Sequence, residues 1–320
     1  MSKSATHQRP YPDLADALKV AFGPAAVREN QALARYTVFH IGGPADLLAV
    51  AENIDVLRQA VTLAWAHDTP CMVLGGGSNV LVSDAGVRGL VVINQAAALT
   101  FLGSRVRAES GASFSCVARQ CVTQGLAGLE WAIGIPGTVG GAVVGNTGAW
   151  GGDVASTLIR ALVLQPDGTV AEWPVERFEY GYRTSVVKRQ EARKPVVLEA
   201  EFALRSGQRE ALEARVAEIV ARRKASQPPG ATCGSMFRNP PGDYAGRLIE
   251  AAGLKGQRRG GAEISSAHAN FIVNHGGATA ADVKALIDLA RQAVQAQYGV
   301  TLGLEIELVG AWIDCSCPGR

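Results

Sequence analysis

Hydrophobic positions recur along the chain with two different periods, and their alternation predicts a protein built from both helices and strands. Helical spacing, with its caps and breakers, predicts helices over residues 14–22, 53–69, 113–125, 210–223, 243–252 and 279–299. Short apolar or alternating runs predict strands over residues 46–51, 71–74, 80–82, 90–93, 159–164, 170–173, 196–204, 270–274 and 300–309. Pro166-Asp167-Gly168 separates two of these strands and predicts a hairpin.

Cap residues mark where two of the predicted helices begin. Ser113 can cap a helix that buries Val117 and Cys121 on one face. Thr279 and Asp282 have the spacing of a capping box. Both helices are therefore expected to pack against a core along one face.

The hydrophobic pattern of the sequence changes before the helix predicted over residues 210–223. Its apolar stripe consists of Leu212, Val216, Ile219 and Val220. A chain of 320 residues is long enough for about two domains, so we place a domain boundary near Ser206. Residues 1–27 are expected to form a peripheral extension with one short helix, and residues 313–320 a loose tail.

The last predicted strand, residues 300–309, alternates apolar with polar positions. Its apolar positions are Leu302, Leu304, Ile306 and Leu308. Successive side chains of a strand point to opposite faces, so Glu305 and Glu307 are expected to share one face. The alternation alone does not distinguish the two carboxylates.

Composition and charge exclude several classes of protein. The chain is 48% hydrophobic and 19% charged, and its 31 basic and 29 acidic residues give a net charge of +2. That balance gives no electrostatic reason to expect nucleic acid as a partner. The N-terminus lacks the apolar core and cleavage site of a secretory signal. No Cys-x-x-Cys spacing occurs, which predicts a cytoplasmic protein without a metal site, with reduced thiols at Cys71, Cys116, Cys121, Cys233, Cys315 and Cys317.

One uncharged stretch, Trp131–Gly152, has the length of a membrane span. It contains eight glycines together with Pro136 and Asn146. A lipid-exposed helix would not tolerate so many backbone breakers. We therefore expect a glycine-rich loop system and no membrane contact.

The segment Gly75-Gly76-Gly77-Ser78-Asn79 lies between two short predicted strands. Successive glycines let backbone N–H groups converge on one point, and such a concavity binds phosphate oxygens without a cation. A tight strand connection explains this segment alone equally well. No Gly-x-Gly-x-x-Gly and no Gly-Lys-Ser/Thr occurs, so the segment is neither a Rossmann site nor a nucleotide-hydrolase loop.

A second glycine-rich run is Ile135-Pro136-Gly137-Thr138-Val139-Gly140-Gly141-Ala142, which continues through Gly145–Ala149. Such a run allows the main chain to approach something large and flat, although crossing loops in a crowded core would also explain it. Two such segments within the first 150 residues favour a dinucleotide that is held by backbone.

Three further segments each contain one residue that could take part in binding or catalysis. Arg183 can grip a carboxylate through its planar fork, although a lone arginine is more often solvated or structural. Ser235 can offer a hydroxyl donor, although serine is common in turns. His268 stands at a strand entrance, where a structural histidine is the simpler interpretation.

These segments, in this order, resemble the UDP-N-acetylenolpyruvoylglucosamine reductase family. The shared pieces are Gly75–Asn79, Ile135–Gly141, Gly181-Tyr182-Arg183-x-Ser185, Gly234-Ser235-x-Phe237-Arg238-Asn239-Pro240, His268-Ala269-Asn270-Phe271 and Leu304-Glu305-Ile306-Glu307. The resemblance spans residues 32–311, and its joint order and spacing are highly specific. Residues 186–234 leave little room for the insertion of the first type, so the chain resembles the second, shorter type.

The resemblance implies an α+β fold. It implies a two-subdomain FAD-binding domain of the vanillyl-alcohol-oxidase type over residues 28–205, split near residue 100. An α+β substrate-binding domain is then expected over residues 206–312.

The resemblance also implies a reaction. FAD, bound non-covalently, and NADPH as reductant would convert the enolpyruvyl ether of UDP-N-acetylglucosamine-enolpyruvate to UDP-N-acetylmuramate, a cytoplasmic step of peptidoglycan synthesis. The two glycine-rich segments would bind the FAD.

Carried over by position, the catalytic residues implied are Arg183, Ser235 and Glu305. Glu305 is preferred to Glu307 because it stands five residues before Gly310, a step that the catalytic glutamate of the family shows. The residues placed at the substrate are Tyr182, Arg238, Asn239, Lys255 and His268, of which Arg238, Asn239 and Lys255 suit the diphosphate.

Two alternatives stay open on the sequence. The first is another FAD-dependent oxidoreductase of the same fold, an alcohol or sugar oxidase, in which His40 is the early candidate for a covalent flavin tether. The second is a non-catalytic UDP-sugar or flavin-binding module. The intact Arg183, Ser235 and Glu305 argue against the second, because a binding module has no use for a proton donor.

Overall fold

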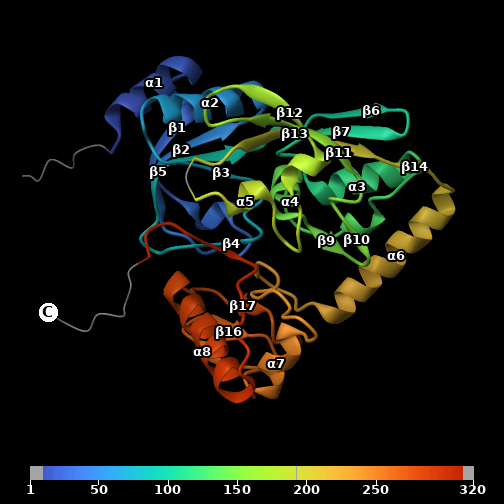
Figure 1. Cartoon of the computed structure of the whole chain (residues 1–320). Coiled ribbons are helices and arrows are strands. Elements are labelled where there is room, and N and C mark those ends of the chain that lie inside the picture. Colours follow the sequence, from blue (N-terminus) through green and yellow to red (C-terminus); the bar gives the residue numbers. More distant parts are fainter. Residues whose placement is uncertain (1–9, 192, 313–320) are drawn as a thin grey trace, which may run out of the picture.

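The computed structural model describes residues 10–191 and 193–312, and within them helices and short strands alternate along the chain (Figure 1). Two sheets with their helices form the upper part of the molecule in this view. A smaller helical part, α7 and α8 with a small sheet, lies below them. The mixture of helices and strands predicted from the hydrophobic pattern is confirmed, and so is the α+β fold that the resemblance implied.

The first sheet contains four strands in the order β1-β2-β5-β3. Their bounds are β1 (Val27–Ala32), β2 (Pro44–Ala51), β5 (Val87–Asn94) and β3 (Cys71–Leu74). β1 runs antiparallel to β2, whereas β2 and β3 run parallel to β5.

Two helices pack against this first sheet, α1 (Pro12–Phe22) and α2 (Ile54–Ala66). Leu14 and Leu18 of α1 are fully buried in the same core cluster as the inner face of α2, so this helix belongs to the core of the first sheet. As predicted, Asn53 caps α2, because its side chain accepts a hydrogen bond from the backbone N–H of Val56.

The second sheet is antiparallel and has five strands in the order β12-β11-β13-β7-β6. Their bounds are β12 (Val170–Pro174), β11 (Leu158–Leu164), β13 (Val196–Ala203), β7 (Arg105–Glu109) and β6 (Leu99–Leu102). The predicted hairpin is confirmed as β11 and β12. Two helices share the core of this sheet, α3 (Phe114–Thr123), which Ser113 caps, and α4 (Val139–Gly145).

Short elements connect the second sheet to the rest of the chain. They are β8 (Leu126–Ala127) paired with β14 (Arg205–Ser206), β9 (Gly148–Ala149) paired with β10 (Gly152–Asp153), and α5 (Val186–Arg189). The long helix α6 (Arg209–Ser226) then runs from this sheet toward the C-terminal part (Figure 1). Its residues Leu212 and Val216 are buried in the core of the second sheet. Val220 was expected on the same stripe, but 42% of it is exposed.

The C-terminal part contains a three-stranded sheet and two helices. The elements are β15 (Arg258–Arg259), β16 (Ala262–Ile264), β17 (Ile272–Asn274), α7 (Ala245–Ala251) and α8 (Ala280–Tyr298). The predicted capping box of Thr279 and Asp282 opens α8. Phe39, Ile41 and Leu81 of the N-terminal part are buried in the same core cluster as α7 and α8, which fixes the C-terminal part against the first sheet.

The predicted strand over residues 300–309 is wrong for most of its length. Only β18 (Glu307–Val309) is a strand, and it pairs in parallel with β4 (Val80–Val82). The preceding residues have no continuous neighbour to pair with, since Leu304 makes only an isolated bridge with Phe237. Leu302 and Ile306 are nevertheless buried, so the alternation correctly identified the apolar side of this segment.

The cysteine thiols that the structure describes are free. Burial raises the pKa of Cys71, Cys121 and Cys233 to about 12, so these thiols stay protonated at neutral pH. Cys315 and Cys317 lie outside the described residues. Within the described part of the chain, no helix is long and apolar enough to cross a membrane.

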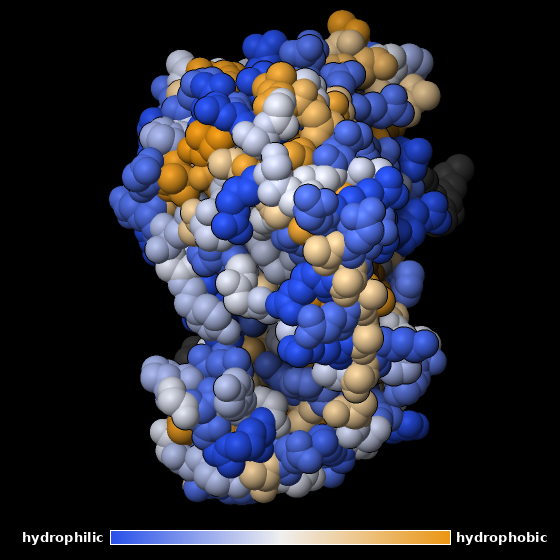
Figure 2. Space-filling view, turned by 90° about the vertical axis from the view of Figure 1, so that its right-hand side faces the viewer, coloured by the Kyte–Doolittle hydropathy of each residue, from blue (hydrophilic) through white to orange (hydrophobic). Residues whose placement is uncertain are grey.

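A space-filling view shows the large upper lobe and the small lower lobe joined across a narrow waist (Figure 2). The large lobe has more hydrophobic residues on this face than the small one. The segments that carry the candidate chemistry join these two parts.

A buried carboxylate organises the outer face of the second sheet. Glu201 on β13 is 3% exposed and forms ion pairs with Arg105, Arg107 and Arg160 at 3.2, 3.3 and 2.9 Å. Removing one partner of a buried charge cluster leaves the other charges without compensation.

We expect Glu201→Leu to lower the free energy of unfolding by about 1.5 kcal/mol, because three arginines that are partly exposed to water then lose their shared acceptor. Chemical unfolding followed by circular dichroism measures the change. The matched control is Glu172→Gln, since Glu172 also pairs with Arg160 but its side chain is 60% exposed. Equal losses for the two variants would contradict a central role of Glu201.

Candidate active site

The two glycine-rich segments meet in space although about 60 residues separate them in the sequence. A Cβ built on Gly76 would lie 3.2 Å from the Cα of Gly137, and one on Gly75 would lie 2.3 Å from the Oγ1 of Thr138. The hydroxyl of Ser78 donates a hydrogen bond to the carbonyl of Pro136 at 3.1 Å. These contacts require glycine, because a side chain at either position would separate the segments.

The first segment presents unused backbone donors. Gly77 has a φ of +57°, and its Cβ would collide with the carbonyl oxygen of Tyr36 at 2.2 Å, so only glycine fits there. In the described part of the chain, the N–H groups of Gly76, Gly77 and Ser78 have no protein acceptor. Such a run of donors is suited to anionic oxygens.

These segments line a cavity of about 520 Å³. Its wall also contains residues that sequence reasoning missed, namely the 35–38 segment, Ile93–Gln95 and Gly111. His40, which the sequence offered only as a tether in the alternative oxidase, lies in the same wall. None of the lining residues is acidic. The sequence contained a signal for one residue of this wall, because Asn94 is a polar residue at the end of a strongly apolar strand. Its amide is buried and donates to the hydroxyl of Ser110 at 2.8 Å.

A second group of residues lies where the C-terminal segment meets the second sheet. The Nε of Arg183 donates to the Oε1 of Glu305 at 2.9 Å, and the Nη2 of Arg183 donates to the carbonyl of Gly148 at 2.5 Å. Both side chains are largely buried, 24% and 20% exposed. The Nη1 of Arg183 has no acceptor among the described residues, so one guanidinium nitrogen stays available to a ligand.

The backbone holds Arg183 in a sparsely populated conformation. Its φ is +58°, which is uncommon for a residue with a side chain. Two side chains fix this turn: the amide of Asn146 donates to the carbonyl of Gly181 at 3.1 Å, and the hydroxyl of Ser185 donates to the carbonyl of Val144 at 2.6 Å. Both contacts tie the turn to α4, and strain held in this way is typical of functional sites.

The two carboxylates of the last segment differ in their surroundings. Glu305 is the more buried, and burial raises the pKa of its carboxyl against the opposing charges of Arg183, Lys188 and Arg238. The side chain of Glu307 is 42% exposed and pairs with Lys188 at 3.5 Å. Both carboxylates contact the same neighbouring segment, as their shared face predicted.

Asn79 connects the glycine-rich loop to this group. Its side-chain amide donates to the backbone carbonyl of Glu305 at 3.1 Å. Its own carbonyl accepts from the N–H of Glu307 at 2.9 Å. The loop at the cavity and the Arg183–Glu305 pair are therefore adjacent parts of one site.

Ser235 lies beside the same C-terminal segment. It forms an isolated bridge with Phe271, and two residues later Phe237 bridges Leu304. The N–H of Arg238 donates to the carbonyl of Gly303 at 2.9 Å. Among the described residues the Ser235 hydroxyl has no hydrogen-bond partner, so it is available to a ligand.

Three of the residues expected at the substrate gather around α7. Asn239 accepts from the N–H of Ala245 at the start of this helix, Lys255 pairs with Glu250 at 2.7 Å, and His268 approaches Gly246. Burial lowers the pKa of His268, and the charge of Lys255 acts in the same direction, which favours neutral imidazole. Tyr182 stands apart from them, 56% exposed, with the Arg183 guanidinium 5.4 Å from its ring centroid.

The fold and the site define an FAD-binding oxidoreductase: a family model described as an FAD binding domain matches residues 45–173. A second model, the C-terminal domain of UDP-N-acetylenolpyruvoylglucosamine reductase, matches residues 225–309.

Relatives extend this likeness over most of the chain. The UDP-N-acetylenolpyruvoylglucosamine reductase of Chloroflexus aggregans is 44% identical over 292 residues, which cover 89% of this chain and 98% of that protein. The reductase of Halalkalibacterium halodurans is 45% identical over 290 residues, 89% and 94% of the two chains. The crystal structure of the enzyme from Thermus caldophilus superposes with a TM-score of 0.75 at 35% identity, covering 88% and 98%. The chain belongs to the UDP-N-acetylenolpyruvoylglucosamine reductase family, as the order of its motifs predicted.

The residues at the cavity fit the FAD of this family. The N–H groups of Gly76, Gly77 and Ser78 are unused donors of the kind that a diphosphate requires. The contact of Gly76 with Gly137 leaves no room for a side chain, so the main chain itself forms the wall. No acidic residue lines the cavity to oppose the phosphate charge.

We expect Gly76→Val to give folded protein with little or no bound flavin. The added side chain meets the Gly137 backbone and must move the loop that carries the free N–H groups. Flavin content, measured from the absorbance ratio of purified protein, checks this. Gly207→Val is the control, because its Cβ has the same 3.2 Å clearance but meets the flexible end of Leu212, away from the cavity. Full flavin content in Gly76→Val would place the phosphate cradle elsewhere.

Proposed function

We propose that this protein is a cytoplasmic enzyme that uses NADPH and FAD to reduce the enolpyruvyl ether of UDP-N-acetylglucosamine-enolpyruvate to UDP-N-acetylmuramate for peptidoglycan synthesis. The observation that carries the proposal is the contact of Arg183 with Glu305 at 2.9 Å, one hydrogen bond away from the cavity loop through Asn79. It supplies a carboxylate-binding cation and a buried acid beside the flavin site.

When bound, FAD supplies the hydride that adds to the methylene carbon of the enol ether. Negative charge then develops on the neighbouring carbon and, by conjugation, on the substrate carboxylate. Arg183 can hold that carboxylate through its free Nη1, because its other nitrogens are fixed by Glu305 and Gly148. Preorganised donors of this kind stabilise charge as it develops.

Glu305 serves as a proton-bearing donor in this scheme. Burial raises the pKa of its carboxyl, and a carboxylic acid kept neutral can donate a hydrogen bond to the developing negative charge. The Ser235 hydroxyl delivers the proton to the carbon that carries the charge, since it has no partner in the described protein and stands beside the Glu305 segment. Hydride and proton together complete the reduction of the carbon–carbon double bond.

The groups around α7, together with Arg238, would bind the other end of the substrate. Arg238 and Lys255 provide positive charge for the UDP diphosphate, and Asn239 and His268 provide polar contacts beside them. His268 is neutral at pH 7 in this role, because burial lowers its pKa.

Visible spectra of the purified protein test the proposal directly. NADPH is expected to bleach the flavin absorbance, and the enolpyruvyl substrate is expected to restore it in the absence of oxygen. The alternative, an alcohol or sugar oxidase, predicts bleaching by an alcohol or sugar and no reoxidation by the enol ether. Yellow colour that precipitates with acid-denatured protein would indicate the covalent tether that His40 could form.

The two carboxylates are expected to differ in function as they differ in surroundings. Glu305→Gln should slow flavin reoxidation by the substrate by about 10²-fold, because the amide N–H is a far weaker acid and donor than the carboxylic acid that it replaces. Glu307→Gln, the matched control, should change it little, because Glu307 is more exposed and pairs with Lys188.

The wild-type rate is expected to depend on pH through the Glu305 carboxyl. The proton-bearing form of Glu305 exists below its raised pKa, so the wild-type rate should fall as pH rises through that value. The amide of Glu305→Gln does not titrate, so the variant should lack this alkaline fall. A larger loss in Glu307→Gln would reverse the assignment.

Ser235 is expected to act only in the second half-reaction. NADPH reduction of the flavin delivers no proton to a substrate carbon, so Ser235→Ala should leave it nearly unchanged. Reoxidation by the enol ether should fall by ~10²–10⁴-fold, the range for a positioned general acid. Ser235→Cys, similar in size and more acidic, should restore part of the rate. Stopped-flow traces separate the steps, and equal slowing of both would mean that Ser235 only shapes the site.

A further inference from the structure

Arg183 stands in a tight turn between Gly181 and Thr184 that two backbone hydrogen bonds close. The N–H of Gly181 donates to the carbonyl of Thr184 at 3.1 Å, and the N–H of Thr184 donates to the carbonyl of Gly181 at 3.3 Å. These two bonds shape the turn but do not attach it to the rest of the protein. The direction of the Arg183 guanidinium therefore depends on the groups that bind the turn from outside.

Asn146 binds this turn and a second segment with the two ends of one side-chain amide. Its Nδ2 donates to the carbonyl of Gly181 at 3.1 Å, and its Oδ1 accepts from the N–H of Ala155 at 3.0 Å. The residue follows α4 in the left-handed conformation, with a φ of +43°, and it is 7% exposed. Because both ends of this buried amide are bonded, the side chain is fixed in one orientation.

The second segment is the β9–β10 hairpin, which contacts the guanidinium of Arg183 directly. Gly148 in β9 provides the carbonyl that accepts from the Nη2 of Arg183. A Cβ on Gly148 would lie 3.3 Å from the Nη1 of Arg183 and 2.8 Å from the Cβ of Asp153, so the guanidinium lies close against the hairpin backbone. Ala155 stands two residues after β10, so Asn146 joins the base of the hairpin to the turn that carries Arg183.

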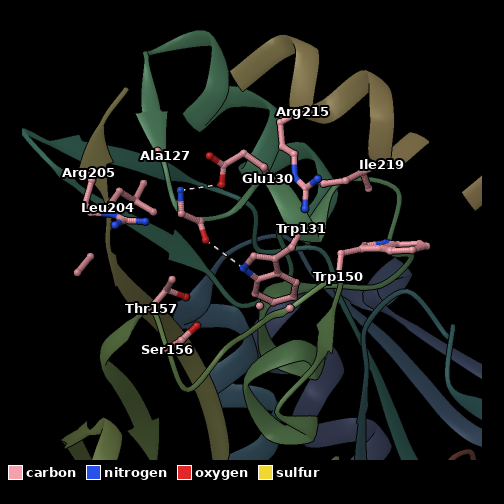
Figure 3. A pocket seen from close by; sticks show the side chains of 14 residues that line it. Ala127, Glu130, Trp131, Trp150, Ser156, Thr157, Leu204, Arg205, Arg215 and Ile219 are labelled. Atoms are coloured by element: carbon pink, nitrogen blue, oxygen red, sulfur yellow. Dashed lines mark hydrogen bonds between the residues drawn. The ribbon is translucent and has the colours of Figure 1, made fainter. Parts of the chain in front are cut away.

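The other side of the hairpin is supported by an aromatic ring (Figure 3). Trp131 is 6% exposed, and its indole N–H donates to the carbonyl of Gly128 at 3.0 Å. A Cβ on Gly152 of β10 would lie 2.3 Å from this ring, so the hairpin packs directly on it. Residues of the hairpin and Trp131 also line a cavity of about 530 Å³. In the described chain, Asn146 is the one side chain besides Arg183 that hydrogen-bonds to both the hairpin and the turn.

We propose that Asn146 is a positioning residue for the reaction, because it holds the Arg183 turn in place against the hairpin that binds the guanidinium. The inference rests on the proposed function of Arg183. The Nε of Arg183 donates to Glu305 and its Nη2 to Gly148, so the direction of the remaining Nη1 depends on both segments. A displacement of about 1 Å in a group that orients a substrate can slow an enzyme about 10²-fold.

Asn146→Gly in the full FAD-loaded chain tests this role. Glycine adopts the left-handed backbone without strain, so the variant loses the two amide bonds while the φ of +43° stays accessible. We expect reoxidation of the flavin by the enol ether to slow about 10-fold, with flavin content and reduction by NADPH within about twofold of wild type. Asn30→Gly is the matched control, because Asn30 has a φ of +51° but lies exposed on β1.

Hydrogen exchange of the Arg183 side chain tests the positioning without the reaction. Its Nε–H donates to Glu305 and the side chain is 24% exposed, so this proton should exchange slowly with water. The nuclear magnetic resonance signal is identified by its absence in Arg183→Gln. It should exchange about 10-fold faster in Asn146→Gly than in Asn30→Gly, because the turn is then less firmly held.

A double variant distinguishes positioning of Arg183 from a general loss of stability. With Arg183→Gln already present, adding Asn146→Gly should slow reoxidation by less than about twofold, because the group that Asn146 positions is gone. If the glycine variant folds poorly, Asn146→Asp, which keeps the acceptor but loses the donor to Gly181, should show the same selective slowing.

Two results would overturn the role of Asn146. One is losses that multiply in the double variant, and the other is Nε–H exchange in Asn146→Gly as slow as in Asn30→Gly. An unchanged reoxidation rate in Arg183→Gln alone would instead contradict the proposed function of Arg183, and the exchange measurement would still test whether Asn146 holds the side chain.

Discussion

Two hydrogen bonds at Asn79 hold the candidate active site together. Its side chain donates to the carbonyl of Glu305, and its carbonyl accepts from the N–H of Glu307, which aligns β18 beside β4. These two bonds join Glu305 and Glu307, near the end of the described chain, to the glycine-rich loop after β3. Together with the β18–β4 pairing and the N–H of Glu305 donated to the carbonyl of Met236, they hold Glu305 where it reaches Arg183.

Burial determines both the energetic cost of the charges in this site and the protonation of Glu305. Taking a carboxylate and a guanidinium out of water is costly unless both are well bonded, and the carbonyl of Gly148 supplies the additional partner for Arg183. The same burial raises the pKa of Glu305, so its proton is retained more readily than in an exposed carboxyl. The left-handed backbone of Arg183 is kept in place because Asn146 donates to the carbonyl of Gly181 in its turn and Ser185, at the end of the turn, donates to the carbonyl of Val144 in α4.

Local signals in the sequence were sufficient for most of the elements and for the two glycine-rich segments that meet at the cavity. Asn53, Ser113 and Thr279 cap helices because a cap depends only on residues within one turn. For Gly76 and Gly137 the sequence predicted only that their two segments serve the same ligand. Their direct contact was not predicted, because it depends on how two sheets pack. The residues 35–38 of the cavity wall carried no local signal for the same reason.

The end of the chain shows where such reasoning fails. Alternation predicted a strand over residues 300–309, but a strand needs a neighbour, and only Glu307–Val309 finds one. Alternation also could not separate Glu305 from Glu307, because their difference arises from Arg183 and Lys188 on a distant segment. A cavity of about 530 Å³ is lined by residues of β14, α6 and the β9–β10 turn, so no single segment encoded it. The domain limits near residues 27 and 206 remain predictions.

In the proposed reaction, Arg183 and Glu305 act as one unit on the developing charge. A double-mutant cycle on the rate of flavin reoxidation by the enol ether tests it most directly, using Arg183→Gln, Glu305→Gln and the double variant. If the pair acts as a unit, the double variant should be slower than the worse single variant by no more than about threefold. Losses that multiply, so that the double variant shows the product of the two single effects, would contradict the account.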